Sequence, residues 1–209
     1  MAEPPYSVEE FWDIVSALAA DVQQCAAAHE AAVKNEEDEK QGEWLWFWRR
    51  MCAHTVFSLI EGATYHLMYI AYVARNSREV VFSLDELEIL EKAYDFDDER
   101  EVEPGLTQEQ MLERIKFAFN AFARVHYSDY ILPTHEEDWL KVKETFRIKA
   151  AISSPQLVRE LEVMDDDVTV LLQATAWFVQ RLVALVESCR DCAGARVASW
   201  EAEKDEPIM

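Results

Sequence analysis

The sequence predicts an all-α fold, a single helical-bundle domain of about five or six helices. Half of the 209 residues are apolar or aromatic, which is enough for a substantial core. Only four glycines and six prolines are present, too few for the many turns of a β-sandwich or a doubly wound sheet. The apolar residues also recur with helical spacing. We expect the domain to span residues 1–200 and the tail, 201–209, to fray.

The first part of the chain predicts two long helices, the second of them central. A capping box at 7–10 precedes a helix that reaches about Val33. The charged segment 34–42 is expected to form a solvated turn. The next helix, 44–74, is apolar on nearly every side, and a helix of that kind is surrounded by others. We therefore place it at the centre of the bundle.

Start signals mark two helices in the middle of the chain. The tetrapeptide that begins at Ser83 opens a short helix reaching about Tyr94. The acidic segment 95–105 is expected to be a loop. Thr107 then begins another capping box and a fourth helix. Its inward-facing residues are expected to be Met111, Ile115, Phe119 and Phe122.

Two long helices are predicted for the last third of the chain. Thr134 is expected to cap a helix that stops near Ile152, and Pro155 fits the first turn of a short helical piece. Three aspartates, Asp165–Asp167, should begin the last long helix, because anions are favoured at a helix N-terminus. That helix is expected to run toward Trp200.

The chain is strongly acidic. Its 41 Asp and Glu residues outnumber 20 Lys and Arg residues, for a formal net charge of −21. Such a field repels polyanions, so nucleic acid is not an expected partner. The acidic surface has two interpretations, a solvated surface without a partner or a surface complementary to a basic partner protein.

Neither an export signal nor a membrane span is predicted. The first residues lack the basic region and the apolar core of a signal peptide. The longest apolar stretch, 44–73, is interrupted by charges such as Arg49 and Glu61, which indicates a buried helix. We expect a cytoplasmic protein, no membrane contact and four reduced cysteines.

The sequence carries no recognisable metal or cofactor motif. Cys189 and Cys192 form a C-x-x-C pair, but zinc needs two more ligands at suitable spacing. Structural thiols are the simpler interpretation. The five histidines are scattered, and Arg49 and His54 are interpreted as a satisfied core or rim pair. We therefore expect no metal and no cofactor.

Glu61 is the most informative single charge, because it stands between Ile60 and Gly62 in the most apolar helix. An ionised carboxylate is rarely buried without a partner. We therefore expect Glu61 to pair with an Arg, Lys or Ser from another helix. Two interpretations stay open: an internal tie between two helices, or a carboxylate that lines a present or former active cleft.

Several segments share the order and spacing of one known family. They are a central apolar helix, a second matching helix, a basic stretch, a Ser-Ser-Pro junction, an acidic linker and a helix with two aromatics, at 57–62, 114–119, 147–149, 153–155, 161–167 and 177–178. This series resembles the HEPN superfamily of all-helical domains over residues 44–186. Many HEPN domains are metal-independent ribonucleases that act as dimers, so the resemblance implies a homodimer.

The same resemblance implies a ribonuclease signature: an Arg, a polar residue, a few more residues and a His often followed by Pro. The His moves protons and the Arg holds phosphate. Aligned on Pro155, this chain has Ser154 in place of the His, Lys149 in place of the Arg and Ala150 in place of the polar residue. We therefore expect this ribonuclease chemistry to be absent.

The sequence favours a non-catalytic HEPN-like interaction module, which forms a homodimer and meets a partner through its acidic surface. Related chains act in bacterial toxin–antitoxin and anti-phage systems, and that role carries over by fold analogy. The alternative is a nucleotide- or RNA-acting enzyme with altered residues, in which Glu61 is the base and Lys149 or Arg147 the phosphate clamp, near Ser154. It requires an open cleft at Glu61. An unrelated helical scaffold is the third interpretation.

Overall fold

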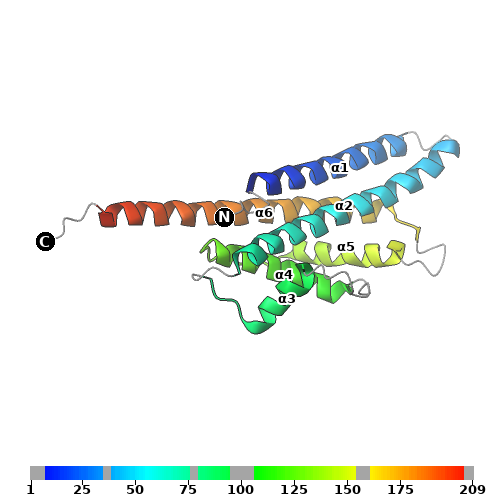
Figure 1. Cartoon of the computed structure of the whole chain (residues 1–209). Coiled ribbons are helices and arrows are strands. Elements are labelled where there is room, and N and C mark those ends of the chain that lie inside the picture. The colour runs from blue at the N-terminus through cyan, green and yellow to red at the C-terminus, as the bar shows by residue number, and fades with distance from the viewer. Residues whose placement is uncertain (1–7, 35–38, 76–79, 95–105, 154–160, 205–209) are drawn as a thin grey trace.

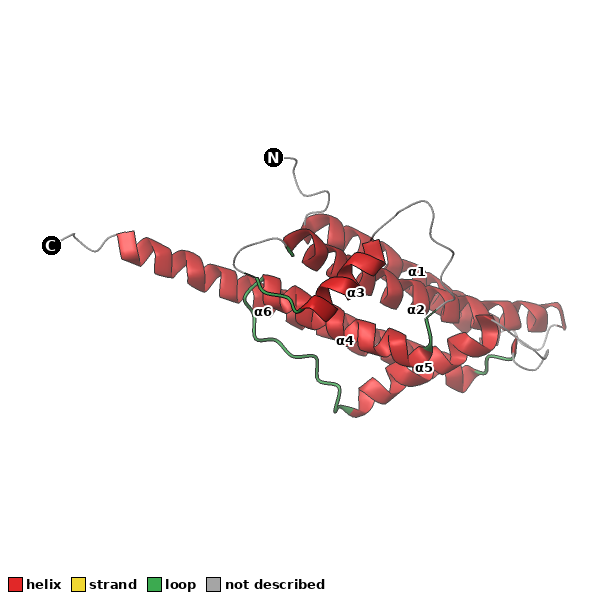
Figure 2. Cartoon of the chain, turned by 60° about the horizontal axis from the view of Figure 1, so that its bottom comes forward, coloured by secondary structure: helices red, strands yellow, loops and turns green. Residues whose placement is uncertain are grey.

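The computed structural model describes residues 8–34, 39–75, 80–94, 106–153 and 161–204. These residues form six α-helices and no strand, so the predicted all-α helical bundle is confirmed (Figure 2). In chain order the helices are α1 (Val8–Lys34), α2 (Glu39–Ala74), α3 (Leu84–Tyr94), α4 (Gln108–Val125), α5 (Glu137–Ser153) and α6 (Asp165–Lys204).

The second helix is the central one, as predicted. It contacts all five other helices, and α1 runs antiparallel along it (Figure 1). Gly62 allows the close approach of this pair, because a Cβ there would lie 2.9 Å from Leu18 Cδ1 of α1. The predicted turn at 34–42 was too long. α2 already begins at Glu39, since Glu, Lys and Gln at its start are good helix formers.

Side chains cap α3 and α4 as the sequence predicts. At α3, Ser83 N donates to Glu86 Oε2 at 2.8 Å, and Glu86 N donates to Ser83 Oγ at 3.2 Å. Thr107 and Gln110 form the same reciprocal capping box at α4. The capping box expected at 7–10 begins outside the described residues, as does the loop at 95–105.

The C-terminus of α4 ends in a Schellman motif that has tyrosine where glycine is usual. Tyr127 N donates to Arg124 O at 3.1 Å, and Ser128 N donates to Ala123 O at 2.9 Å. Tyr127 occupies this turn with a φ of 60°, in the left-handed region. Tyr127 therefore adopts a backbone conformation that glycine adopts at lower cost.

The fifth helix begins later than the sequence predicts. Thr134 does not cap it, because the amides of Thr134 and Glu136 donate instead to the carbonyls of Leu132 and Pro133, which makes a turn. α5 begins at Glu137 and ends at Ser153, close to the expected end. The short helical piece expected at Pro155 lies outside the described residues.

α6 runs along the bundle and its C-terminal part extends past the other helices (Figure 1). Its aspartates begin the helix as predicted, and Asp167 Oδ2 accepts a hydrogen bond from Met164 N at 2.9 Å. α6 continues to Lys204, inside the segment expected to fray. By length and composition alone, Asp165–Ala195 could cross a membrane, and 44% of its apolar window is buried inside the bundle.

The apolar residues predicted to face inward are buried. Phe11 and Val15 of α1 are buried in the core, and the ring centroids of Phe119 on α4 and Phe178 on α6 lie 5.8 Å apart, edge to face. Trp177 Nε1 donates to Glu136 Oε2 at 2.6 Å, which ties α6 to the turn before α5. This single core fixes the positions of α2, α4 and α5.

A candidate site between α2, α4 and α5

The expected partner of Glu61 is Lys149. Its ammonium contacts Glu61 Oε1, so the ion pair joins α2 to α5. Lys149 Nζ also lies 5.4 Å from the ring centroid of Phe57, within the range of a cation–π interaction. The two charged side chains are 31% and 39% exposed, so the pair is only partly buried. The prediction that Glu61 pairs with a basic or hydroxyl side chain of another helix is confirmed.

An open pocket of about 860 Å³ lies beside this pair. α2 forms one wall, the first two turns of α4 form the second, and the last two turns of α5 form the third. Its volume falls within the range of pockets that hold small organic ligands. The described residues that line it are Glu61, Gly62, Thr64, Tyr65, Met68, Leu106, Thr107, Gln108, Met111, Arg114, Phe146, Lys149, Ala150 and Ser153.

Three charged side chains are among these lining residues: Glu61, Arg114 and Lys149. Burial lowers the pKa of the Lys149 ammonium, while a carboxylate in contact favours the charged form. Arg114 is half-buried, and no carboxylate of the described residues lies within ion-pair distance of it. Counting only the residues that the structure describes, the pocket therefore contains one cation in an ion pair and one without.

Arg147 does not join this site, which corrects its candidacy as a clamp beside Glu61. Its side chain is 60% exposed, and its Nε donates to Glu144 Oε1 at 2.6 Å. Residues two apart on a helix point to different faces, so Arg147 and Lys149 cannot both face Glu61. Ser154 lies outside the described residues, although its neighbour Ser153 lines the pocket.

Arg49 is buried and satisfied, as expected, but its partner is Asp165 rather than His54. Arg49 is 7% exposed, and its Nε and Nη2 donate to Asp165 at 2.9 and 2.7 Å. His29 Nε2 lies 2.8 Å from Asp165 Oδ1. Hydrogen bonds from Arg49 lower the pKa of Asp165 most, His29 lowers it further, and partial burial opposes both. This cluster ties α1 and α2 to the start of α6.

The four cysteines lie in α1, α2 and α6. Among the residues that the structure describes, no group of three or more His, Cys, Asp or Glu side chains could hold a metal ion. Burial raises the pKa of the Cys52 thiol to about 12 and that of Cys189 to about 11. Cys189 and Cys192 both lie within α6. High thiol pKa values are typical of inert structural cysteines.

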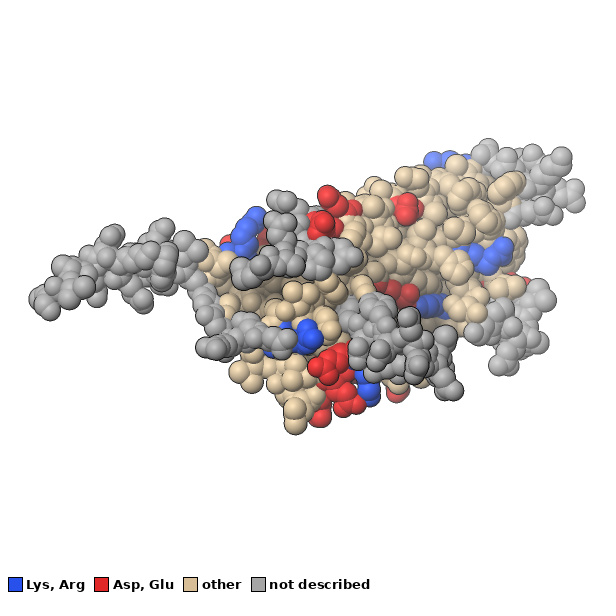
Figure 3. All heavy atoms as spheres, in the orientation of Figure 1, with Lys and Arg blue, Asp and Glu red and all other residues tan. Residues whose placement is uncertain are grey.

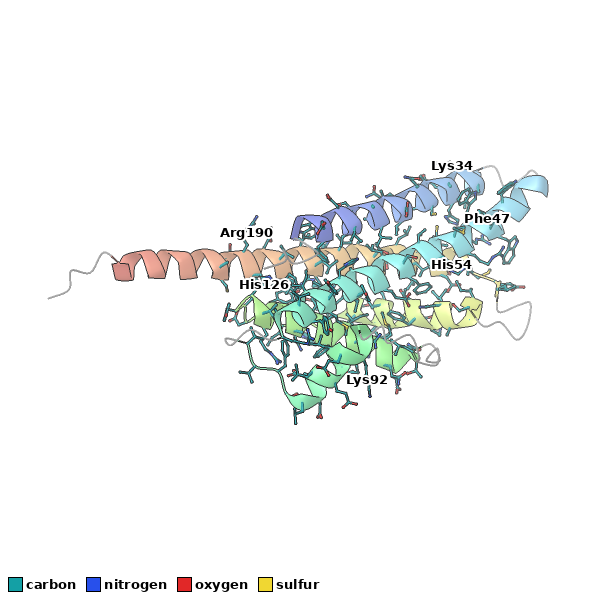
Figure 4. The ribbon with its side chains drawn as sticks, in the orientation of Figure 1. Lys34, Phe47, His54, Lys92, His126 and Arg190 are labelled. Carbon is teal, nitrogen blue, oxygen red and sulfur yellow. The ribbon has the colours of Figure 1, made fainter. Side chains whose placement is uncertain are left out.

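Two exposed aromatic rings that contact each other, Trp44 and Phe47, lie near the start of α2 and are here called the aromatic patch. Trp44 is 56% exposed, and its ring meets that of Phe47 edge to face with centroids 5.7 Å apart. Phe47 and Lys34 lie at the same end of the α1–α2 pair (Figure 4). On the face shown in Figure 3, acidic side chains gather over α3 and the N-terminal half of α1.

The fold and pocket define an all-α bundle with a charged, open pocket and a separate aromatic patch. Comparison with known protein families, with curated proteins and with solved structures found no match to this chain. The site must therefore be interpreted from its own geometry.

Proposed function

We propose that the protein is a non-catalytic, HEPN-like helical interaction module that pairs with a second copy and binds a basic partner protein. The observation that carries this proposal is the aromatic patch. Trp44 and Phe47 expose large apolar surface near one end of the α1–α2 pair, at a cost of unfavourable contact with water. Exposed Trp and Phe in a group are typical of interface cores rather than of free surface.

The charge of the chain separates the two kinds of partner. Two copies that each carry −21 repel one another, so their association must rely on apolar contact. A basic protein is instead attracted by the same field. Added salt screens both effects, so it strengthens pairing between copies and weakens binding of a basic partner.

The test is the molar mass in solution over a series of salt concentrations. We expect a dimer whose population grows with salt, and a monomer for the variant Trp44→Ser/Phe47→Ser. Ile131→Ser, a matched change at an exposed apolar residue of another segment, should stay dimeric. A wild-type monomer at every salt concentration, or a dimer that survives the loss of both rings, would count against pairing through the patch.

The setting of this module is inferred by analogy. We place it in the bacterial cytoplasm, in a toxin–antitoxin or anti-phage system, because HEPN domains act there. In such a system, its basic partner would be encoded nearby, and co-expression of the neighbouring protein with this chain tests that expectation. A complex that dissociates as salt is raised supports the proposal, whereas a neighbour that does not bind contradicts it.

A nucleotide- or RNA-acting enzyme is the second candidate, favoured by one observation: the Glu61–Lys149 pair faces an open pocket rather than a sealed core. In this function Glu61 accepts a proton and Lys149 holds a phosphate. An RNA-cleavage assay of the wild type, with Glu61→Gln as the inactive control, tests it. We expect no cleavage, and Ser154→His alone should not create it, because Lys149 stands where the family has Arg.

A further inference from the structure

The described residues that line the pocket beside Glu61 carry an excess of positive charge, although the chain is acidic overall. Among the described lining residues, Arg114 and Lys149 are cations and Glu61 is the one carboxylate, so one positive charge is in excess. In the whole chain acidic residues outnumber basic ones about two to one. The described lining residues therefore have a net charge of opposite sign to that of the chain as a whole, and a local excess of positive charge attracts anions.

Arg114 is the group that a ligand would engage. It is half-buried and makes no ion pair with the described carboxylates, whereas Lys149 already contacts Glu61. A guanidinium offers two parallel N–H donors, which match the two oxygens of a carboxylate. A carboxylate between Arg114 and Lys149 would give Arg114 a partner and share Lys149 with Glu61.

The rest of the pocket suits an apolar body. Met68 of α2, Met111 of α4 and Phe146 of α5 line its walls, together with Leu106 before α4. Methionine side chains are flexible and polarisable, so they adapt to the shape of an apolar guest. A volume of about 860 Å³ is far larger than a bare inorganic ion needs.

We propose that this pocket binds an amphipathic monoanion, a single carboxylate on an apolar body. One negative charge neutralises the excess charge of the lining residues. A nucleotide brings further negative charges that would meet Glu61 and the net charge of −21. A neutral apolar molecule would leave Arg114 without a partner. The inference stands on the pocket alone and does not depend on pairing through the aromatic patch.

The experiment measures the affinity of the whole chain for three probes by titration calorimetry: decanoate, decanol and adenosine monophosphate. We expect decanoate to bind at least about tenfold more tightly than decanol, since a charge-assisted hydrogen bond contributes on that scale. Adenosine monophosphate should bind more weakly than decanoate. Equal affinity for decanol would identify a plain apolar cavity, and tighter binding of the nucleotide would support the enzyme alternative; either result overturns the inference.

Three variants locate the site. Arg114→Gln should weaken decanoate binding by about tenfold. Glu61→Gln should tighten it, because the competing carboxylate is removed from Lys149. Arg190→Gln, the same chemical change on the surface of α6 outside the pocket (Figure 4), should leave affinity unchanged.

Shifts of backbone amide resonances in the wild type provide a check that needs no variant. Decanoate should shift the amides of Met68, Met111 and Phe146, which line three different walls. Shifts confined to the aromatic patch, or an equal loss of affinity in Arg114→Gln and Arg190→Gln, would overturn the assignment.

Discussion

Lys149 on α5 contacts Glu61 on α2, and both side chains line the same open pocket. The pair thus joins two helices and also places two charged groups at the wall of the pocket. These are the two roles that the sequence left open for Glu61, and the geometry accommodates both.

The stability that this pair supplies should be modest. A double-mutant cycle of Glu61→Gln and Lys149→Gln, read by urea unfolding, should give a coupling free energy of about 0.5–1 kcal/mol, because both groups are partly solvated. The exposed pair Glu113–Lys116 within α4 is the matched control and should give less. A coupling indistinguishable from zero would mean that the contact does not hold α2 and α5 together.

The Arg49–Asp165 pair should contribute more to the unfolding free energy than the Glu61–Lys149 pair does. Asp165→Asn leaves the buried Arg49 guanidinium without its carboxylate, and we expect a loss of about 2 kcal/mol in unfolding free energy at neutral pH. Asp166→Asn, an adjacent exposed change, should cost less than half as much. Equal costs for the two variants would show that Arg49 does not depend on Asp165.

The same pair gives a signed pH dependence. The pKa of Asp165 is lowered in the folded protein from its ordinary value of 3.8, chiefly by Arg49. Its contribution is therefore complete above pH 3.8 and is lost as the pH falls through the lower, folded pKa. The difference in stability between wild type and Asp165→Asn should shrink over that acidic interval. A difference that stays constant to the lowest pH at which the protein folds would contradict the pairing.

The four thiols should differ in reactivity. Cys52 and Cys189 are buried, with pKa values of about 12 and 11, so almost no thiolate exists at mildly alkaline pH. Cys192 is partly exposed and should react first with a disulfide reagent. All four should react after unfolding in guanidinium. Rapid labelling of Cys189 together with Cys192 in the folded protein would contradict the inert C-x-x-C interpretation.

Tyr127 stands where a glycine would relieve backbone strain. Tyr127→Gly should raise the unfolding free energy by up to about 1 kcal/mol, because glycine adopts a φ of 60° without steric cost. Asp129→Gly, two residues on, should be neutral or destabilising. Thermal unfolding of both variants checks this, and a destabilised Tyr127→Gly would show that contacts of the Tyr127 side chain outweigh the strain.

Local signals predicted most of the fold. The capping boxes at Ser83 and Thr107 need only four consecutive residues, and helical spacing places Phe119 and Phe122 inward without knowledge of their partners. The prediction that Thr134 caps α5 was wrong, because an N-cap residue directly precedes the first residue of its helix and α5 begins only at Glu137. The amides of Thr134 and Glu136 instead donate backward to the carbonyls of Leu132 and Pro133 in a turn.

Only part of the candidate site and its neighbouring ion pairs could be predicted from the sequence. A carboxylate in an apolar helix required a partner for Glu61, and the enzyme alternative placed Lys149 near it. Asp165 was not expected to pair with Arg49, because its position at the start of α6 already explained its charge. Arg114 carries no local motif, so nothing in the sequence placed it at the pocket. The sequence alone could have excluded Arg147 as a second partner of Glu61. Residues advance by about 100° around a helix, so two residues that are two positions apart, such as Arg147 and Lys149, do not share one face.

The central proposal, that the aromatic patch is an interface, is tested most directly at one ring. In protein labelled with fluorotryptophan, the Trp44 resonance is assigned by its loss in Trp44→Phe, and its position is followed from micromolar to millimolar protein at high salt. The account predicts that this signal shifts with concentration while that of buried Trp139 does not. A Trp44 signal that stays fixed over the whole range would contradict it.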